Sequence, residues 1–310
     1  MIPSEHIPQY KQTLQWLRNS RTPSIRYLTM RNILGMAESE AQVQTARQAI
    51  ALELPVTATL KAQHPEGYWE QARHVYSPKY RSSHWSMLFL TELSIQPEND
   101  VLQKGAEFML AAVENNPPWY LTRKEEGFSC FWGNWLRYML YCGKKQDQRV
   151  QDVIAFVCAD VERRGRCRYN SNLGCAWAVA RDLFGLAIIP PNERSAQVHA
   201  AIDTGIHFLL DEYDLLKANY PADNKKHPLW NSFSYPLYYH TDKLYILRIL
   251  KELSALEHPK AQTALDWLLT KQHKNGTWSG GSPFRSSRPF LAAPDGVERW
   301  ITLWVLSVLT

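Results

Sequence analysis

The stretch TKQHKNGTW at residues 270–278 ends one apolar helical segment and leads toward the next. The stretch KAQHPEGYW at 61–69 has the same pattern, Q-x-x-x-G-x-W, and RRGRCRY at 163–169 is a degenerate version. In each full copy the glutamine closes a helix and the glycine permits a sharp turn. The tryptophan is then placed to pack back over the helix end. The repeat predicts a series of helical hairpins joined by similar turns.

Apolar residues recur at i, i+3, i+4 and i+7 along most of the chain, and alternating, strand-like runs are scarce. Segments with this spacing cover 84–93, 101–113, 131–143, 149–161, 175–186, 198–210, 244–256, 261–272 and 299–309. Helical spacing of apolar residues is the main sequence signal for α-helix. We therefore predict an all-α protein.

Two kinds of helical segment alternate. Segments that begin near His84, Phe131, Cys175, Tyr239 and Trp300 are apolar around much of their circumference, at steps of 47, 44, 64 and 61 residues. The segments between them are amphipathic, with one polar face. Enclosed inner helices alternating with half-exposed outer helices predict either an open superhelix or a closed double-layered barrel.

Composition limits the kind of protein. The chain has 310 residues, 45% of them apolar, which is enough for one large core. Its net charge of +5 comes from scattered residues, so we expect no nucleic-acid partner. We expect no transmembrane segment and no secretory signal. Five cysteines, an odd number, favour reduced thiols and a cytoplasmic location over a disulfide framework.

The Q-x-x-x-G-x-W pattern resembles the repeat of squalene and hopene cyclases and of protein prenyltransferase β subunits. From roughly residue 40 to 310 the chain resembles prenyltransferase and squalene-oxidase repeat proteins, through YSPKYRSSHW, WLLTKQHKNGTW and RWITLWVL. The resemblance implies one domain over 1–310, an α/α toroid of about five to six hairpins around an apolar cavity. The first 40 residues either close the ring or dock outside it.

Two motifs of terpene chemistry are missing from the sequence. Triterpene cyclases protonate their substrate through a D-x-D-D run, and this chain has neither that run nor a D-D-x-x-D magnesium motif. The nearest acidic cluster, LLDEYDLL at 209–216, has the pattern of an amphipathic surface segment. We therefore do not expect a triterpene cyclase.

Protein prenyltransferase β subunits hold zinc through an Asp and a Cys at the start of one inner helix and a His in a later Y-H-T segment. The segment LGCAW places Cys175 on the zinc cysteine, with Leu173 where the aspartate would stand. The segment YYHTD places His240 on the zinc histidine. The resemblance thus implies a zinc site from which one ligand is missing.

The spacing of the cysteines bears on the same site. Cys175 and His240 lie at the starts of inner segments, Cys130 has the same kind of position one hairpin earlier, and Cys167 lies in the turn before Cys175. Three thiols and an imidazole suit tetrahedral zinc, with Asp242 as another ligand or as the acceptor of the imidazole N–H. The alternatives are plain packing of buried thiols and a redox-active or nucleophilic thiol.

Aromatic and polar residues of the inner segments are candidates for the cavity wall, where aromatic faces suit an isoprenoid chain. These candidates are His84, Trp85, Trp132, Asn134, Trp177, Tyr239 and Trp300. For each of them, packing in the core is the alternative. Cys142 and Cys158 lie inside apolar helical patterns, which predicts core positions.

The expected function is that of a prenyltransferase- or terpene-cyclase-like protein that transfers or processes an isoprenoid-like substrate with zinc. The alternative is a non-catalytic protein that encloses a lipid or a peptide and carries a structural Cys3His zinc site, since four protein ligands leave no open position. A scaffold that binds another protein is a third hypothesis. A heterodimeric prenyltransferase would also need an α-subunit-like partner.

Overall fold

A computed structural model describes residues 10–115, 129–217, 227–282 and 296–310. Over these ranges the chain forms thirteen α-helices and no β-strand, with only two isolated β-bridges. The prediction of an all-α protein is confirmed. None of the helices in these ranges is long and apolar enough to span a membrane.

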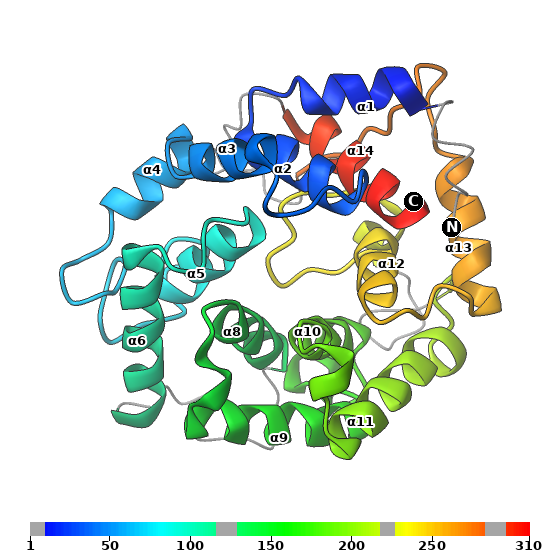
Figure 1. Cartoon of the computed structure of the whole chain (residues 1–310). Coiled ribbons are helices and arrows are strands. Elements are labelled where there is room, and N and C mark those ends of the chain that lie inside the picture. The colour runs from blue at the N-terminus through cyan, green and yellow to red at the C-terminus, as the bar shows by residue number, and fades with distance from the viewer. Residues whose placement is uncertain (1–9, 116–128, 218–226, 283–295) are drawn as a thin grey trace.

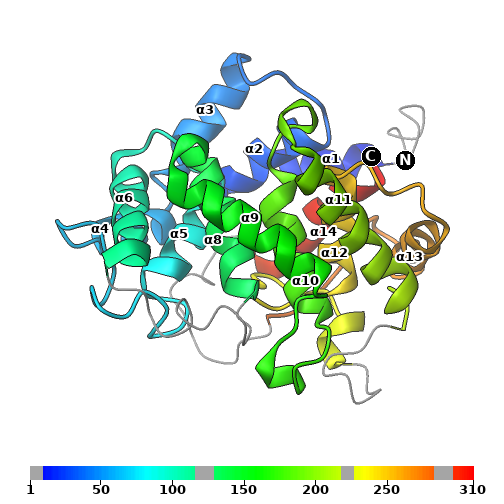
Figure 2. The ribbon, with the colours of Figure 1, turned by 90° about the horizontal axis from the view of Figure 1, so that it is seen from below.

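The helices form an inner and an outer set (Figure 1). The inner set is α2 (Pro23–Asn32), α5 (Ser83–Glu92), α8 (Ser129–Tyr141), α10 (Ala176–Ala187), α12 (Lys243–Glu252) and α14 (Gly296–Leu309). The outer set is α1 (Lys11–Arg18), α3 (Ala41–Ile50), α4 (Leu54–Lys61), α6 (Asp100–Asn115), α9 (Gln148–Glu162), α11 (Ala196–His207) and α13 (Pro259–Leu269). Figure 2 shows α9 and α11 in front of α8 and α10.

Burial separates the two sets as their composition predicts. Every residue of α10 is buried, and so is every residue of α5 except Glu92. In the outer helix α11, by contrast, only four residues are buried. A helix that is apolar around most of its circumference is stable only when neighbours cover it on several sides. These inner helices therefore form the centre of the core.

The tryptophan turns have the predicted form. Trp69 and Trp278 each donate the indole N–H to the carbonyl oxygen ten residues earlier, at 2.7 and 2.8 Å, so each ring packs back over the end of an outer helix. Gly67 and Gly276 have φ angles of +95° and +79°, which favour glycine. Trp230 also donates its indole N–H to a main-chain carbonyl oxygen, that of Leu215, at 2.8 Å, although the sequence pattern does not mark it.

One inner helix begins later than the sequence pattern indicates, and another begins earlier. Helix α12 begins at Lys243 rather than near Tyr239, because Asp242 is its N-cap and accepts a hydrogen bond from the Tyr245 N–H. Helix α14 begins at Gly296, ahead of Trp300. The other three inner helices begin within two residues of their expected starts.

The N-terminal segment joins the inner set. Helix α2 packs against α14 as well as against α1 and α3. Leu17 of α1 and Ile25 of α2 are fully buried within the same hydrophobic core as the later hairpins. The sequence leaves two positions open for the first 40 residues: they either close the ring or dock outside it. In the structure, the described part of this segment packs beside the last inner helix, α14.

Helices α8 and α10 approach closely because both carry glycine at their contact. A Cβ atom on Gly133 would lie 2.2 Å from the carbonyl oxygen of Arg181, and one on Gly185 would lie 2.6 Å from that of Gly133. Any larger residue at either position would force the backbones apart. This contact joins the first half of α8, which contains Cys130, to the second half of α10.

Candidate functional site

The structure places three of the predicted ligands in one region, around the amino-terminal ends of α8 and α10. Cys130 lies in the first turn of α8, Cys175 is the N-cap residue of α10, and Cys167 lies in the turn between α9 and α10. Burial raises the pKa of the Cys130 thiol to about 12, and the nearby Cys167 adds to the rise. Burial also raises the pKa of Cys175 well above its usual value, again with a contribution from Cys167. In this fold the thiols of Cys130 and Cys175 are therefore neutral at physiological pH.

The fourth predicted ligand, His240, packs among aromatic rings. Its ring stacks on Tyr239 with centroids 4.2 Å apart and meets Trp177 edge-on at 5.0 Å. Its Nδ1 atom lies 3.2 Å from the carbonyl oxygen of Leu237. Burial lowers the pKa of the imidazole to about 4, so the ring is neutral at pH 7.

Asp242 serves as a helix cap. Its two carboxylate oxygens accept hydrogen bonds from the main-chain N–H groups of Tyr245, at 2.8 Å, and Ser234, at 3.3 Å. Burial raises its pKa to about 7. The described residues include no group of three or more His, Cys, Asp or Glu side chains arranged to hold a metal ion. We therefore assign no chemical step to a zinc ion. The zinc site that the sequence predicts stays a prediction.

His84 and Trp85 occupy the core. His84 is fully buried, stacks on Phe131 with centroids 4.4 Å apart, and lies within 3.2 Å of the Tyr138 hydroxyl through Nδ1. Burial lowers the pKa of its imidazole to about 3. Trp85 donates its indole N–H to the carbonyl oxygen of Tyr76 at 2.8 Å. These contacts are those of packed, hydrogen-bonded core residues.

The remaining candidates for the cavity wall also have packing partners. Asn134 donates to the carbonyl oxygen of Tyr238 at 3.3 Å, and Trp300 stacks on Tyr235 with centroids 4.4 Å apart. Tyr239 is half-buried under the ammonium group of Lys79. Trp132 and Trp177 are buried, as are the predicted core residues Cys142 and Cys158.

A cavity of about 500 Å³ lies elsewhere, among the carboxyl-terminal ends of the inner helices. All six inner helices contribute to its wall, whereas Cys130 and Cys175 lie at the opposite, amino-terminal ends of α8 and α10. The wall includes none of the seven residues that the sequence marks for a cavity. Four aromatic side chains line it, those of Tyr27, Tyr141, Phe184 and Trp304.

The cavity wall also carries charge. Its basic residues are Arg31, Arg137, Arg248 and Lys251, and its acidic residues are Glu92 and Glu252. These charges are scattered over α2, α5, α8 and α12, so no local motif announces them. Sequence reasoning missed all six, because only the fold brings them to one place.

Three of the four basic side chains are engaged with the protein. Arg137 makes a two-pronged ion pair with Glu252, at 2.6 and 3.1 Å. Arg31 pairs with Glu38 at 3.1 Å. Lys251 donates to a main-chain carbonyl oxygen of α14. Such contacts fix the three cations and satisfy groups near the helix ends.

Arg248 differs from its three neighbours. Its guanidinium carbon lies 3.5 Å from the ring centroid of Trp304 and 5.5 Å from that of Tyr245. Among the described residues the guanidinium has no hydrogen-bond or ion-pair partner within the usual distances. Burial lowers its pKa, although the nearby Glu92 opposes the change. A stacked arginine with free N–H donors therefore faces the cavity.

Glu92 is the acidic counterpart. It is the last residue of α5, lines the cavity, and forms no ion pair with any residue that the structure describes. Burial raises its pKa, while Arg181, Arg248 and Arg137 act in the opposite direction. Among the described residues that line the cavity, Arg248 and Glu92 are therefore a cation and a carboxyl group without an ion-pair partner.

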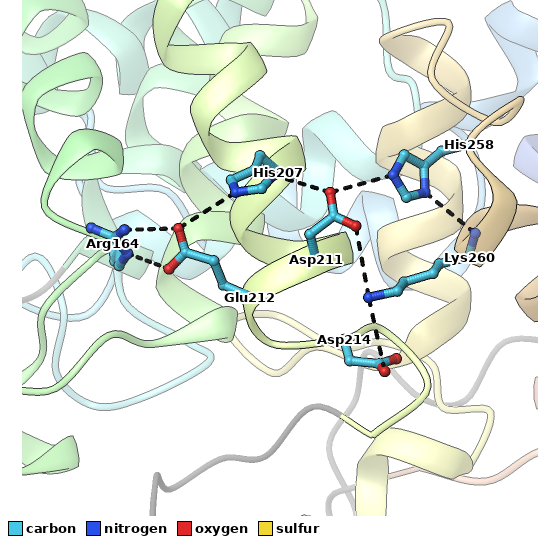
Figure 3. A network of polar contacts seen from close by, with 7 residues as sticks. All are labelled: Arg164, His207, Asp211, Glu212, Asp214, His258 and Lys260. Atoms are coloured by element: carbon cyan, nitrogen blue, oxygen red, sulfur yellow. Dashed lines mark hydrogen bonds and ion pairs between the residues drawn. The ribbon is translucent and has the colours of Figure 1, made fainter.

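A second cluster of charged residues lies on the outside of the molecule (Figure 3). Arg164 holds Glu212 with two contacts, at 2.5 and 2.7 Å. Asp211 lies 3.0 Å from His207 and 3.4 Å from His258, which precedes α13. Asp211 and Glu212 end a short π-helix (Phe208–Glu212) that continues α11. This external network connects three outer elements, and the acidic segment around 209–216 presents its charges at the surface as predicted.

Comparison with protein-family models gives no match, and comparisons with curated proteins and with solved structures give no significant match either. The resemblance to prenyltransferase and squalene-oxidase repeat proteins therefore remains a hypothesis that depends on the motifs quoted above.

Proposed function

We propose that the chain is an α/α toroid, related to prenyltransferases and terpene cyclases, that encloses an isoprenoid-like molecule in its central cavity. The alternation of enclosed inner and half-exposed outer helices supports the toroid. So does the recurrence of the turn in which Trp69 and Trp278 cap an outer helix. Fold similarity alone says little about function, so the functional part depends on the cavity.

The observation that carries the proposal is the cavity with walls from all six inner helices. Its volume of about 500 Å³ falls within the range of about 300–1,000 Å³ that is usual for small-molecule sites. The side chains of Trp304, Phe184 and two tyrosines line the cavity, and guanidinium groups lie over the rings of Trp304 and Phe184, so an unsaturated chain would pack beside these aromatic side chains. An apolar molecule of moderate length is the ligand that such a wall favours.

Binding is better supported than group transfer. Cys130 and Cys175, the thiols that the resemblance and the spacing assign to zinc, lie at the other ends of the helices from the cavity. A role in enclosing a lipid-like molecule follows from the geometry without any catalytic group. Zinc-dependent transfer remains an expectation from the resemblance alone.

Thermal unfolding with farnesol tests the proposal. We expect saturating farnesol to raise the melting temperature by several degrees, because a ligand that binds only the folded state stabilises it. The increase should be smaller for Trp304→Ala, which removes one wall of the cavity, but not for Trp16→Ala, which lies outside it. No increase with farnesol or with geranylgeraniol would overturn the proposal.

A further inference from the structure

We propose that the molecule held in the cavity carries a carboxylate, and that Arg248 is the residue that binds it. This inference depends on the proposed function, because it names the head group of a ligand whose apolar body lies against the aromatic wall. It concerns the carboxyl-terminal ends of the inner helices, and neither the cysteines nor any metal takes part.

The first step is the state of the Arg248 side chain. Its guanidinium carbon is in van der Waals contact with the indole of Trp304, at 3.5 Å from the ring centroid. Stacking of this kind covers one face of the guanidinium and leaves its in-plane N–H groups able to donate. Among the described residues, none accepts from them. A group with up to five donors thus faces the space where a ligand would lie.

The second step is the number of available charges. Arg137 forms an ion pair with Glu252, and Arg31 forms one with Glu38. Lys251 donates a hydrogen bond to a main-chain carbonyl oxygen. Of the basic residues described in the wall, Arg248 is therefore the one whose guanidinium has no hydrogen-bond or ion-pair partner. A planar guanidinium matches a planar carboxylate through two parallel N–H···O bonds. A diphosphate carries more negative charge than one guanidinium neutralises, and burying the excess is unfavourable.

The third step is the position of Glu92. This carboxyl group lines the same cavity and interacts electrostatically with Arg248. In its ionised form this carboxyl group repels further negative charge, which favours a ligand with a single charge over one with several. Glu92 also provides an independent test. Replacing it with glutamine removes a negative charge near the ligand and should strengthen carboxylate binding.

The experiment compares three ligands that share the farnesyl chain and differ in the head group: farnesol, farnesoic acid and farnesyl diphosphate. Calorimetric titration of the full chain measures each affinity. We expect farnesoic acid to bind about 10- to 100-fold more tightly than farnesol, the usual gain from a charge-assisted pair of hydrogen bonds. We expect farnesyl diphosphate to bind more weakly than farnesoic acid.

Three variants connect the preference to the named residues. Arg248→Met keeps an apolar stem beside Trp304 but removes the guanidinium. It should bind farnesoic acid no more tightly than farnesol. Retained binding of farnesol shows that the variant is folded. Glu92→Gln should bind farnesoic acid about threefold or more tightly and farnesol unchanged. Arg81→Met, at a 58% exposed side chain outside the cavity, should match the wild type for all ligands.

The outcomes separate the two proposals. Equal affinities for farnesol and farnesoic acid would overturn the carboxylate inference and leave the proposed function standing. An unchanged advantage of farnesoic acid in Arg248→Met would also overturn it. Tighter binding of farnesyl diphosphate would replace the carboxylate with a more highly charged head group and contradict the inference. Failure of all three ligands to bind would overturn the proposed function itself.

Discussion

Burial decides which of the candidate side chains carry charge. The pKa of Cys130 is raised to about 12, whereas those of His240 and His84 are lowered to about 4 and about 3. In all three cases removal from water is the largest cause, and it favours the neutral form. The sequence identified these residues by type and position along their helices. It could not predict their charge, because that depends on residues distant in the sequence, such as Phe131 beside His84 and Trp177 beside His240.

His84 gives a prediction about pH. Its folded pKa of about 3 lies below the unfolded value of about 6.5, so its neutral form contributes stability that is complete above pH 6.5 and is lost as the pH falls. His84→Gln lacks this term. We therefore expect the difference in free energy of unfolding between wild type and variant to narrow by about 2 kcal/mol between pH 7.5 and pH 5.

Urea denaturation at the two pH values measures this difference. The matched control is His199→Gln, because the His199 side chain is exposed. It measures how far replacing an exposed imidazole changes the free energy of unfolding. A difference for His84→Gln that narrows no more than the control's would show that His84 is not buried in its neutral form.

Close contact between helices positions the inner set. Helices α8 and α10 approach through Gly133 and Gly185, and this approach places Arg181 where its guanidinium lies over the Tyr245 ring at 3.8 Å. On the outside, the network around Asp211 connects α11 and its π-helical end to the start of α13 (Figure 3). Helix spacing and the tryptophan turns were predictable from local patterns. The glycine contact was not, because its two halves are more than 50 residues apart.

Gly133→Ala tests the helix contact. Alanine normally stabilises a helix relative to glycine by about 1 kcal/mol. Here its Cβ would meet the Arg181 carbonyl oxygen at 2.2 Å, so we expect the free energy of unfolding to fall by about 3 kcal/mol or more. In Gly281→Ala the new Cβ would meet no atom within 4 Å, so that variant should unfold like the wild type. Urea denaturation of both variants distinguishes them, and equal stability of Gly133→Ala and wild type would contradict the close approach.

At the scale of the whole molecule, the two ends of the inner helices have different characters. The amino-terminal ends carry Cys130, Cys175 and His240, which the sequence identifies because their residue types and motifs are distinctive. The carboxyl-terminal ends carry the cavity, whose wall runs from Tyr27 to Val308 along the chain. No local pattern marks Arg248 or Glu92, since arginine and glutamate near a helix end are usually solvated. Their significance depends on six helices meeting, which only the tertiary structure shows.

A crystal structure of the protein with farnesoic acid locates the ligand at one end of the inner helices or the other. We expect the farnesyl chain to pack beside Trp304 and Phe184 and the carboxylate to bind Arg248, with no contact to the cysteines. Ligand bound instead beside Cys175 and Trp177, with the cavity at the carboxyl-terminal ends left to solvent, would contradict it.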